Sequence, residues 1–201
     1  MTNRIILAAL GACLASMPAL ASAQPAGSAA EAPKDDLVRV KLETSAGPIV
    51  LALDRGRAPL TVANFLAYVD GHKFDGEGFY RAMPYGKGGL IQAGIGSDAR
   101  KLLPPVAFES TARTGLANRA GTVAMAAAAP GKAQSDFFIM TTDIPAFDGD
   151  SGFAAFGHVV EGMDVVKAIL AAPVSVTKGD GVMKGQMLDP VVKIVKAVRV
   201  E

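Results

Sequence analysis

The feature that most constrains this fold is a succession of short strand-like segments with few helical stretches between them. Val38, Val40 and Leu42 alternate with charged residues, a pattern typical of a strand with one solvent-exposed face. A turn at residues 46–48 leads into a second strand at residues 49–53, so the two form a hairpin. Further strand-like segments cover residues 79–94, where a Pro- and Gly-rich loop joins two of them, and residues 121–125, 137–141, 153–160 and 191–200. Strands in consecutive runs predict an antiparallel sheet.

Two stretches have the spacing of amphipathic helices. Pro59 begins the first, at a position where its missing N–H costs nothing, and Val62 and Phe65 lie on its apolar face. The second covers residues 163–171, with Asp164 in the first turn, where negative charge is favourable. Strands at both ends of the domain favour closure of the sheet into a barrel without free edges. The sequence therefore predicts a mainly β protein, an antiparallel β-barrel with two α-helices.

The first residues of the chain have the pattern of an export signal. Arg4 supplies a positive start, residues 5–20 form an apolar run, and residues 21–23 are small, as at a cleavage site. Pro18 and the barely membrane-spanning length of the run argue against a membrane anchor. Lipoprotein processing at Cys13 is a less favoured alternative, because Cys13 lies inside the apolar run.

The rest of the chain divides into two parts. Residues 24–36 are rich in Ala, Pro, Gly and Ser without a periodic pattern, which is typical of a flexible tether. Residues 37–201 are enough for one domain with its own core. We therefore expect a signal peptide over residues 1–23, a tether, and a single folded domain. After removal of the signal, the expected protein is periplasmic and has no membrane span.

Charge, cysteine and histidine content exclude several classes of protein. The chain has 20 basic and 19 acidic residues, without the basic excess that a general nucleic-acid binder needs. Cys13 is the only cysteine, so the exported domain has no disulfide and relies on its core. His72 and His158 are far apart and have no ligand-type residues at metal-binding spacing, so neither a metal nor another cofactor is expected.

Two polar residues interrupt the apolar pair of strands within residues 79–94, namely Arg81 and Gln92. Arginine is almost never fully buried without a partner. From the pattern alone, Arg81 is either a solvated outward residue or a hydrogen-bond donor that points into a pocket. Hydrophobicity alone does not distinguish these alternatives.

Six segments occur in the order seen in one protein family. They are residues 58–65 (APLTVANF), 79–81 (FYR), 90–94 (LIQAG), 121–126 (GTVAMA), 135–139 (SDFFI) and 156–163 (FGHVVEGM). The chain resembles an exported bacterial cyclophilin-type peptidyl-prolyl cis-trans isomerase over about residues 37–200. The resemblance implies a closed eight-stranded antiparallel β-barrel, two α-helices over its ends, and a proline-binding groove on the outside of the barrel.

The resemblance also implies roles for individual residues. Arg81 corresponds to the catalytic arginine of the family, and Gln92 to the glutamine that helps to place it. Phe138 corresponds to the aromatic floor of the proline pocket. The remaining positions implied to bind substrate are Met125, Ala126, Leu90 and Phe147.

Some positions differ from the family pattern. Gly89 stands in place of a wall aromatic, Ala127 in place of Asn or Arg, and Phe153 in place of a His found in many eukaryotic members. Asp136 stands where the family usually has Gln, and we expect its carboxylate near the groove, among the substrate-binding residues. It could pair with Arg81, face the peptide backbone or point to solvent, and the sequence leaves these three alternatives open.

The residue types suit catalysis of peptide-bond rotation. The barrier of roughly 18–20 kcal/mol comes from the double-bond character of C–N, and X-Pro exchange without a catalyst takes tens to hundreds of seconds or so. A catalyst must be complementary to the twisted bond, in which the proline nitrogen has regained its lone pair. A guanidinium can donate to that nitrogen and stays charged, so neither a nucleophile nor a cofactor is needed.

The expected function is acceleration of X-Pro isomerisation during the folding of exported proteins. The expected partners are proline-containing peptides and unfolded exported proteins, with no nucleic acid, and the expected protein is a monomer. One alternative is a binding module of the same fold, a proline-peptide-binding chaperone with little turnover. Another is a hollow, ligand-carrying barrel, which the large side chains of the strand patterns disfavour.

Overall fold

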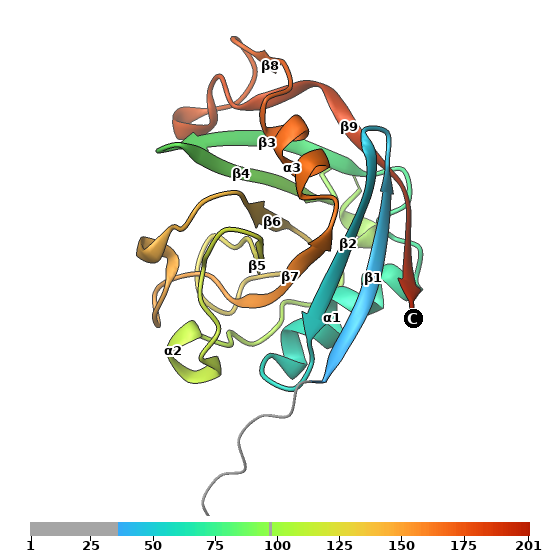
Figure 1. Ribbon diagram of the computed structural model, residues 1–201, viewed down its shortest axis with the longest axis vertical. Coiled ribbons are helices and arrows are strands. Elements are labelled where there is room, and N and C mark those ends of the chain that lie inside the picture. The colour runs from blue at the N-terminus through green and yellow to red at the C-terminus, as the bar shows by residue number, and fades with distance from the viewer. Residues whose placement is uncertain (1–35, 97) are drawn as a thin grey trace, which may run out of the picture. The chain divides into compact units, whose positions relative to one another are not determined.

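The computed structural model describes residues 36–96 and 98–201, which contain nine β-strands and three α-helices (Figure 1). The strands are β1 (Leu37–Thr44), β2 (Gly47–Asp54), β3 (Gly78–Tyr85), β4 (Gly88–Gly94), β5 (Thr122–Met125), β6 (Phe137–Met140), β7 (Ala155–Glu161), β8 (Val174–Ser175) and β9 (Met187–Val200). The helices are α1 (Pro59–Asp70), α2 (Thr111–Thr114) and α3 (Met163–Leu170). The predicted export signal, Cys13 and nearly all of the predicted tether lie outside the described residues.

The strands form one antiparallel sheet that closes on itself. The order is β1-β2-β7-β5-β6-β4-β3-β9, and β9 pairs back onto β1, so eight strands complete a barrel. The short strand β8 adds to β9 outside this ring. Closure leaves these strands without a free edge for another chain to extend. The prediction of a closed eight-stranded antiparallel barrel is confirmed.

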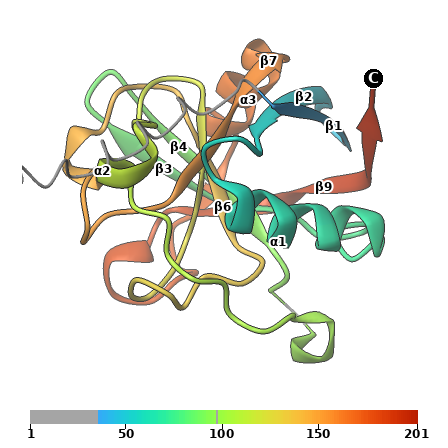
Figure 2. The ribbon, with the colours of Figure 1, turned by 90° about the horizontal axis from the view of Figure 1, so that it is seen from below.

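Helices α1 and α3 lie over opposite ends of the barrel (Figures 1 and 2). Phe65 and Val69 of α1 are buried against the barrel core, and so are Val166 and Ile169 of α3. A helix with one apolar face is stabilised by packing that face on a sheet or another apolar surface, as both helices do here.

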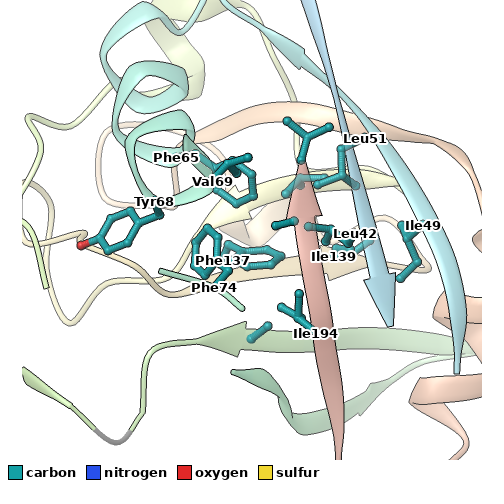
Figure 3. Close-up of a cluster of buried hydrophobic side chains, with 14 of the residues drawn as sticks. Leu42, Ile49, Leu51, Phe65, Tyr68, Val69, Phe74, Phe137, Ile139 and Ile194 are labelled. Carbon is teal, nitrogen blue, oxygen red and sulfur yellow. The ribbon is translucent and has the colours of Figure 1, made fainter. Parts of the chain in front are cut away.

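The barrel interior is filled with aliphatic and aromatic side chains (Figure 3). Leu42, Leu51 and Ile139 have no exposed surface, and the Phe65 ring packs against that of Phe137 with centroids 5.1 Å apart. Burial of an apolar side chain of this size contributes roughly 1.5–3 kcal/mol. A filled interior argues against a hollow barrel that carries a ligand inside.

The helix count differs from the sequence prediction. The two expected helices are present as α1 and α3, and α2 is a third helix of four residues. It ends at Gly115, whose φ of 69° lies in the left-handed region that favours glycine. One helical turn is too short to show a 3.6-residue periodicity, so pattern analysis misses it. Within the described part of the chain, no helix has the length and apolar character needed to cross a membrane.

Candidate active site

A groove of about 620 Å³ lies against strands β3, β4 and β6 and the loops beside them. On β4, Ile91 and Ala93 belong to the barrel core, whereas Leu90 and Gln92 line the groove. Successive side chains of a strand point to opposite faces of the sheet. The groove is therefore on the outer face of the barrel wall.

A β-bulge at Tyr80 directs Arg81 into this groove. Phe79 pairs with Ala93 and Arg81 pairs with Gln92, so Tyr80 is an extra residue on β3. Without the bulge, Phe79 and Arg81 would point to the same face, because they are two residues apart. Phe79 instead is fully buried in the core, while both Tyr80 and Arg81 line the groove. Bulges of this kind often redirect a side chain next to an active site.

Two glutamines hold the guanidinium of Arg81. Its Nη1 atom donates to Gln92 Oε1 at 3.0 Å, and its Nε atom donates to Gln186 Oε1 at 2.9 Å. Gln186 is anchored in turn, because its Nε2 atom donates to the backbone oxygen of Val182 at 2.8 Å. Arg81 is half-buried, and this burial lowers the pKa of its guanidinium from the usual value. The side chain is thus held by neutral acceptors and keeps its charge for a ligand.

A second polar group lies beside this arginine. The Tyr80 hydroxyl donates to Asp136 Oδ2 at 2.6 Å and accepts from Gln92 Nε2 at 2.5 Å. The other carboxylate oxygen of Asp136 accepts from Ser135 Oγ at 3.0 Å. Burial, followed by the nearby Asp136 charge, raises the pKa of Tyr80 well above its usual range. Tyr80 therefore stays a neutral hydrogen-bond donor.

Three phenylalanines form the apolar end of the groove. Phe138 contacts Phe153 and Phe147 edge to face, with ring centroids 5.2 and 5.7 Å apart. Leu90 belongs to the same apolar cluster, which is separate from the barrel core. An apolar concave pocket beside a few convergent polar groups is the usual form of a small-ligand site.

Comparison with known proteins identifies the family. Residues 39–198 match the family model described as cyclophilin type peptidyl-prolyl cis-trans isomerase/CLD. The chain belongs to this cyclophilin family. A cyclophilin assignment fits both the closed barrel and the position of the groove on its outside.

Several curated proteins are similar to this cyclophilin. It is 36% identical over 141 residues to a peptidyl-prolyl cis-trans isomerase of Acinetobacter baylyi, covering 68% of this chain and 73% of that protein. It is 39% identical over 135 residues to peptidyl-prolyl cis-trans isomerase A of Dickeya dadantii, covering 65% of this chain and 70% of that one.

Solved cyclophilin structures share the fold. A crystal structure of a Cryptosporidium parvum cyclophilin type peptidyl-prolyl cis-trans isomerase superimposes with a TM-score of 0.67 at 20% sequence identity, covering 82% of this chain and 98% of that one. A second structure of the same protein, solved in the presence of the dipeptide Ala-Pro, gives a TM-score of 0.66 at 21% identity, covering 81% and 99% of the two chains.

The groove brings together most of the site residues expected for a cyclophilin. Those that line it are Arg81, Gln92, Phe138, Ala126, Leu90, Phe147 and Asp136. Their individual roles in binding and catalysis stay predictions. Phe153 and Ala127, two of the positions that differ from the family pattern, also line the groove.

Met125 lies elsewhere. Its side chain is 1% exposed, belongs to the barrel core, and lines a second cavity of about 130 Å³ instead of the groove. Met125 and Ala126 are neighbours in an extended segment, so their side chains point to opposite sides. The structure therefore separates Met125 from the other expected binding residues.

Asp136 lines the groove, as expected, and its carboxylate has partners that the sequence did not suggest. Its carboxylate is bound by Tyr80 and Ser135, and among the described residues it forms no ion pair with Arg81. Tyr80, which lines the groove, and Gln186, which accepts a hydrogen bond from Arg81, were not predicted, for different reasons. Tyr80 directly precedes Arg81, but only the bulge places both on one face. Gln186 is 105 positions from Arg81 and lies in a segment without a periodic pattern.

No metal site accompanies the groove in the residues that the structure describes: no three His, Cys, Asp or Glu side chains there are grouped so that they could hold an ion.

Proposed function

We propose that this chain isomerises X-Pro bonds in the groove, with Arg81 as the residue that stabilises the twisted bond. As a member of the cyclophilin family, the chain is a peptidyl-prolyl cis-trans isomerase. The observation that carries the assignment of Arg81 is its environment. A guanidinium held by two neutral glutamines lines the same groove as three phenylalanine rings.

The catalytic role of Arg81 follows from how the reacting bond changes. In the planar ground state the proline nitrogen shares its lone pair with the carbonyl group and is a poor acceptor. In the twisted state the lone pair returns to nitrogen and can accept a hydrogen bond from the guanidinium. An interaction that is stronger in the transition state than in the ground state raises the rate. Arg81 donates without transferring a proton, because the guanidinium stays protonated.

The apolar end of the groove, formed by the three phenylalanines, provides the second part of the site. Phe138 is only 3% exposed at the base of the groove, where Leu90 and Phe147 pack against it. A proline ring is apolar and rigid, so it can bury surface there at little entropic cost. Binding of the ring fixes the X-Pro bond relative to Arg81. An apolar surrounding also strengthens the electrostatic effect of the guanidinium.

Unfolded exported proteins are the proposed substrates, and the periplasm is the proposed location. The support is the sequence pattern of residues 1–23, which is typical of a cleavable export signal. The proposed form is a monomer that needs no cofactor and binds proline-containing peptides, without affinity for nucleic acid. The near-balance of 20 basic and 19 acidic residues fits this proposal.

A protease-coupled assay on a short Ala-Pro peptide tests the proposed function. The wild type is expected to accelerate isomerisation, and Arg81→Ala is expected to lose about 100-fold in kcat, the usual cost of removing one donor from a transition-state site. Arg39→Ala is the matched control, because Arg39 is an exposed residue of β1 that does not line the groove. Peptide binding without turnover by the wild type would favour the binding-module alternative.

A further inference from the structure

The hydrogen bonds beside Arg81 form a chain in which each side chain has one orientation. An ionised Asp136 carboxylate can only accept hydrogen bonds, so the Tyr80 hydroxyl uses its single O–H to donate a hydrogen bond to Asp136. The hydroxyl oxygen is then available to accept from Gln92 Nε2. With its nitrogen engaged by Tyr80, the Gln92 amide presents its Oε1 atom to Arg81. A guanidinium has no acceptor atom, so Arg81 can only donate to the amide oxygen of Gln92. Arg81 and Tyr80 therefore require the same orientation of this amide.

The fold holds Asp136 at the far end of this chain. Ser135 Oγ donates to its Oδ1 atom, and Ser135 itself is 2% exposed. Asp136 also lies against Gly94 of β4, and any side chain at residue 94 would collide with Asp136. A Cβ atom at Gly94 would be 2.0 Å from Oδ1 and 2.8 Å from the Cα atom of Asp136. The carboxylate therefore occupies a space that exists because residue 94 has no side chain.

We infer that Tyr80 and Asp136 are positioning residues for isomerisation, which fix the Gln92 amide in the orientation that holds Arg81 for the twisted bond. The inference rests on the proposed function of Arg81. It goes further because it gives a task to two residues that contact Gln92 or each other rather than the guanidinium. Gln92 is 7% exposed, so it has little access to water as a substitute partner if Tyr80 is removed.

The main alternative is that Asp136 lowers turnover instead of supporting it. A carboxylate close to the groove could weaken the positive charge that Arg81 presents to the substrate. Removal of the carboxylate would then raise turnover. If Asp136 instead acts through the hydrogen-bond chain, removal of its carboxylate lowers turnover, because Tyr80 loses the acceptor that determines the orientation of its hydroxyl. The sign of the change thus separates the two explanations.

The first test is Tyr80→Phe, which removes only the hydroxyl. We expect kcat on the Ala-Pro peptide to fall roughly 3- to 10-fold, the factor set by one hydrogen bond of ordinary net strength, with KM nearly unchanged. Tyr85→Phe is the matched control, because Tyr85 is on the same strand, 47% exposed and outside the groove. Equal kcat in Tyr80→Phe and the wild type would overturn the inference.

The second test concerns Asp136. We expect Asp136→Ala to lower kcat to about the level of Tyr80→Phe, and Asp136→Asn, which keeps an acceptor for Tyr80, to retain most of the activity. The double variant Tyr80→Phe/Asp136→Ala should lose no more than either single variant, since both act through Gln92. Additive losses, or a rise in kcat of Asp136→Ala, would overturn the inference.

Arg81→Ala in the same assay separates failure of this inference from failure of the proposed function. If Arg81→Ala lowers kcat about 100-fold and the Tyr80 and Asp136 variants match the wild type, only the positioning role is wrong. If Arg81→Ala keeps the kcat of the wild type, the proposed role of Arg81 is wrong and the inference falls with it.

Discussion

Arg81 combines partial burial with a retained positive charge. Burial lowers its pKa, yet the usual value of a guanidinium is so high that it remains protonated at working pH. Its two glutamine partners are neutral, so they orient the charge without cancelling it. A single residue can therefore act by electrostatic complementarity to the twisted bond, provided that its neighbours keep it in place.

Tyr80 gives a prediction for stability at alkaline pH. Its pKa is raised in the folded protein, chiefly by burial and then by Asp136, relative to about 10 in an unfolded chain. The folded state thus retains a proton that the unfolded state releases, so stability is complete below about pH 10 and falls as the pH rises further. We expect Tyr80→Phe to lose less stability than the wild type between about pH 9 and 11.

Urea unfolding at the two pH values measures this effect. Burial also raises the pKa of Tyr68, so the variant should still lose some stability. Tyr85→Phe, which removes an exposed hydroxyl, should lose as much as the wild type. An equal loss in Tyr80→Phe and Tyr85→Phe would contradict the expectation.

At the level of elements, helix α1 is capped by a residue from a distant loop. Ala58 precedes the helix and offers no side-chain hydrogen bond. Glu109 instead accepts from the backbone N–H of Leu60 at 3.1 Å and of Thr61 at 2.7 Å. A carboxylate at this end also interacts favourably with the helix dipole. The loop that follows β4 is thereby tied to α1.

Removal of this cap should destabilise the protein without affecting catalysis. We expect Glu109→Ala to cost about 1 kcal/mol in the free energy of unfolding, with turnover on the Ala-Pro peptide unchanged. Glu161→Ala, at an exposed position at the end of β7, is the control and should be nearly neutral. Denaturant unfolding of the three proteins provides the measurement. Equal stability of Glu109→Ala and the wild type would show that the cap contributes nothing.

Elements with a long periodic pattern were predictable from the sequence, and local irregularities were not. The spacing of Val62 and Phe65 predicted α1, whereas the single turn of α2 has no period to detect. The bulge at Tyr80 depends on the pairing of β3 with β4 and β9, which local sequence does not specify. For the same reason, the inward direction of Met125 became clear only in the structure.

On the scale of the whole domain, pairing of β1 with β9 closes the barrel. The filled interior argues against a ligand inside the barrel, and the groove lies on the outer face. Six ordered segments of the sequence were enough to predict this fold, the family and six of the residues that line the groove, and the family resemblance added Phe147, which lies outside them. Gln186 could not be predicted, because its contact with Arg81 depends on how the loop before β9 folds.

The most direct test of the central claim compares turnover with peptide affinity in the wild type, Arg81→Ala and Arg81→Lys. Lysine keeps the positive charge but lacks the planar fork that meets both Gln92 and Gln186. If Arg81 acts mainly on the twisted bond, kcat falls about 100-fold in Arg81→Ala and substantially in Arg81→Lys, while the Kd of the Ala-Pro peptide changes little. A loss confined to peptide affinity, with kcat unchanged in both variants, would contradict the account.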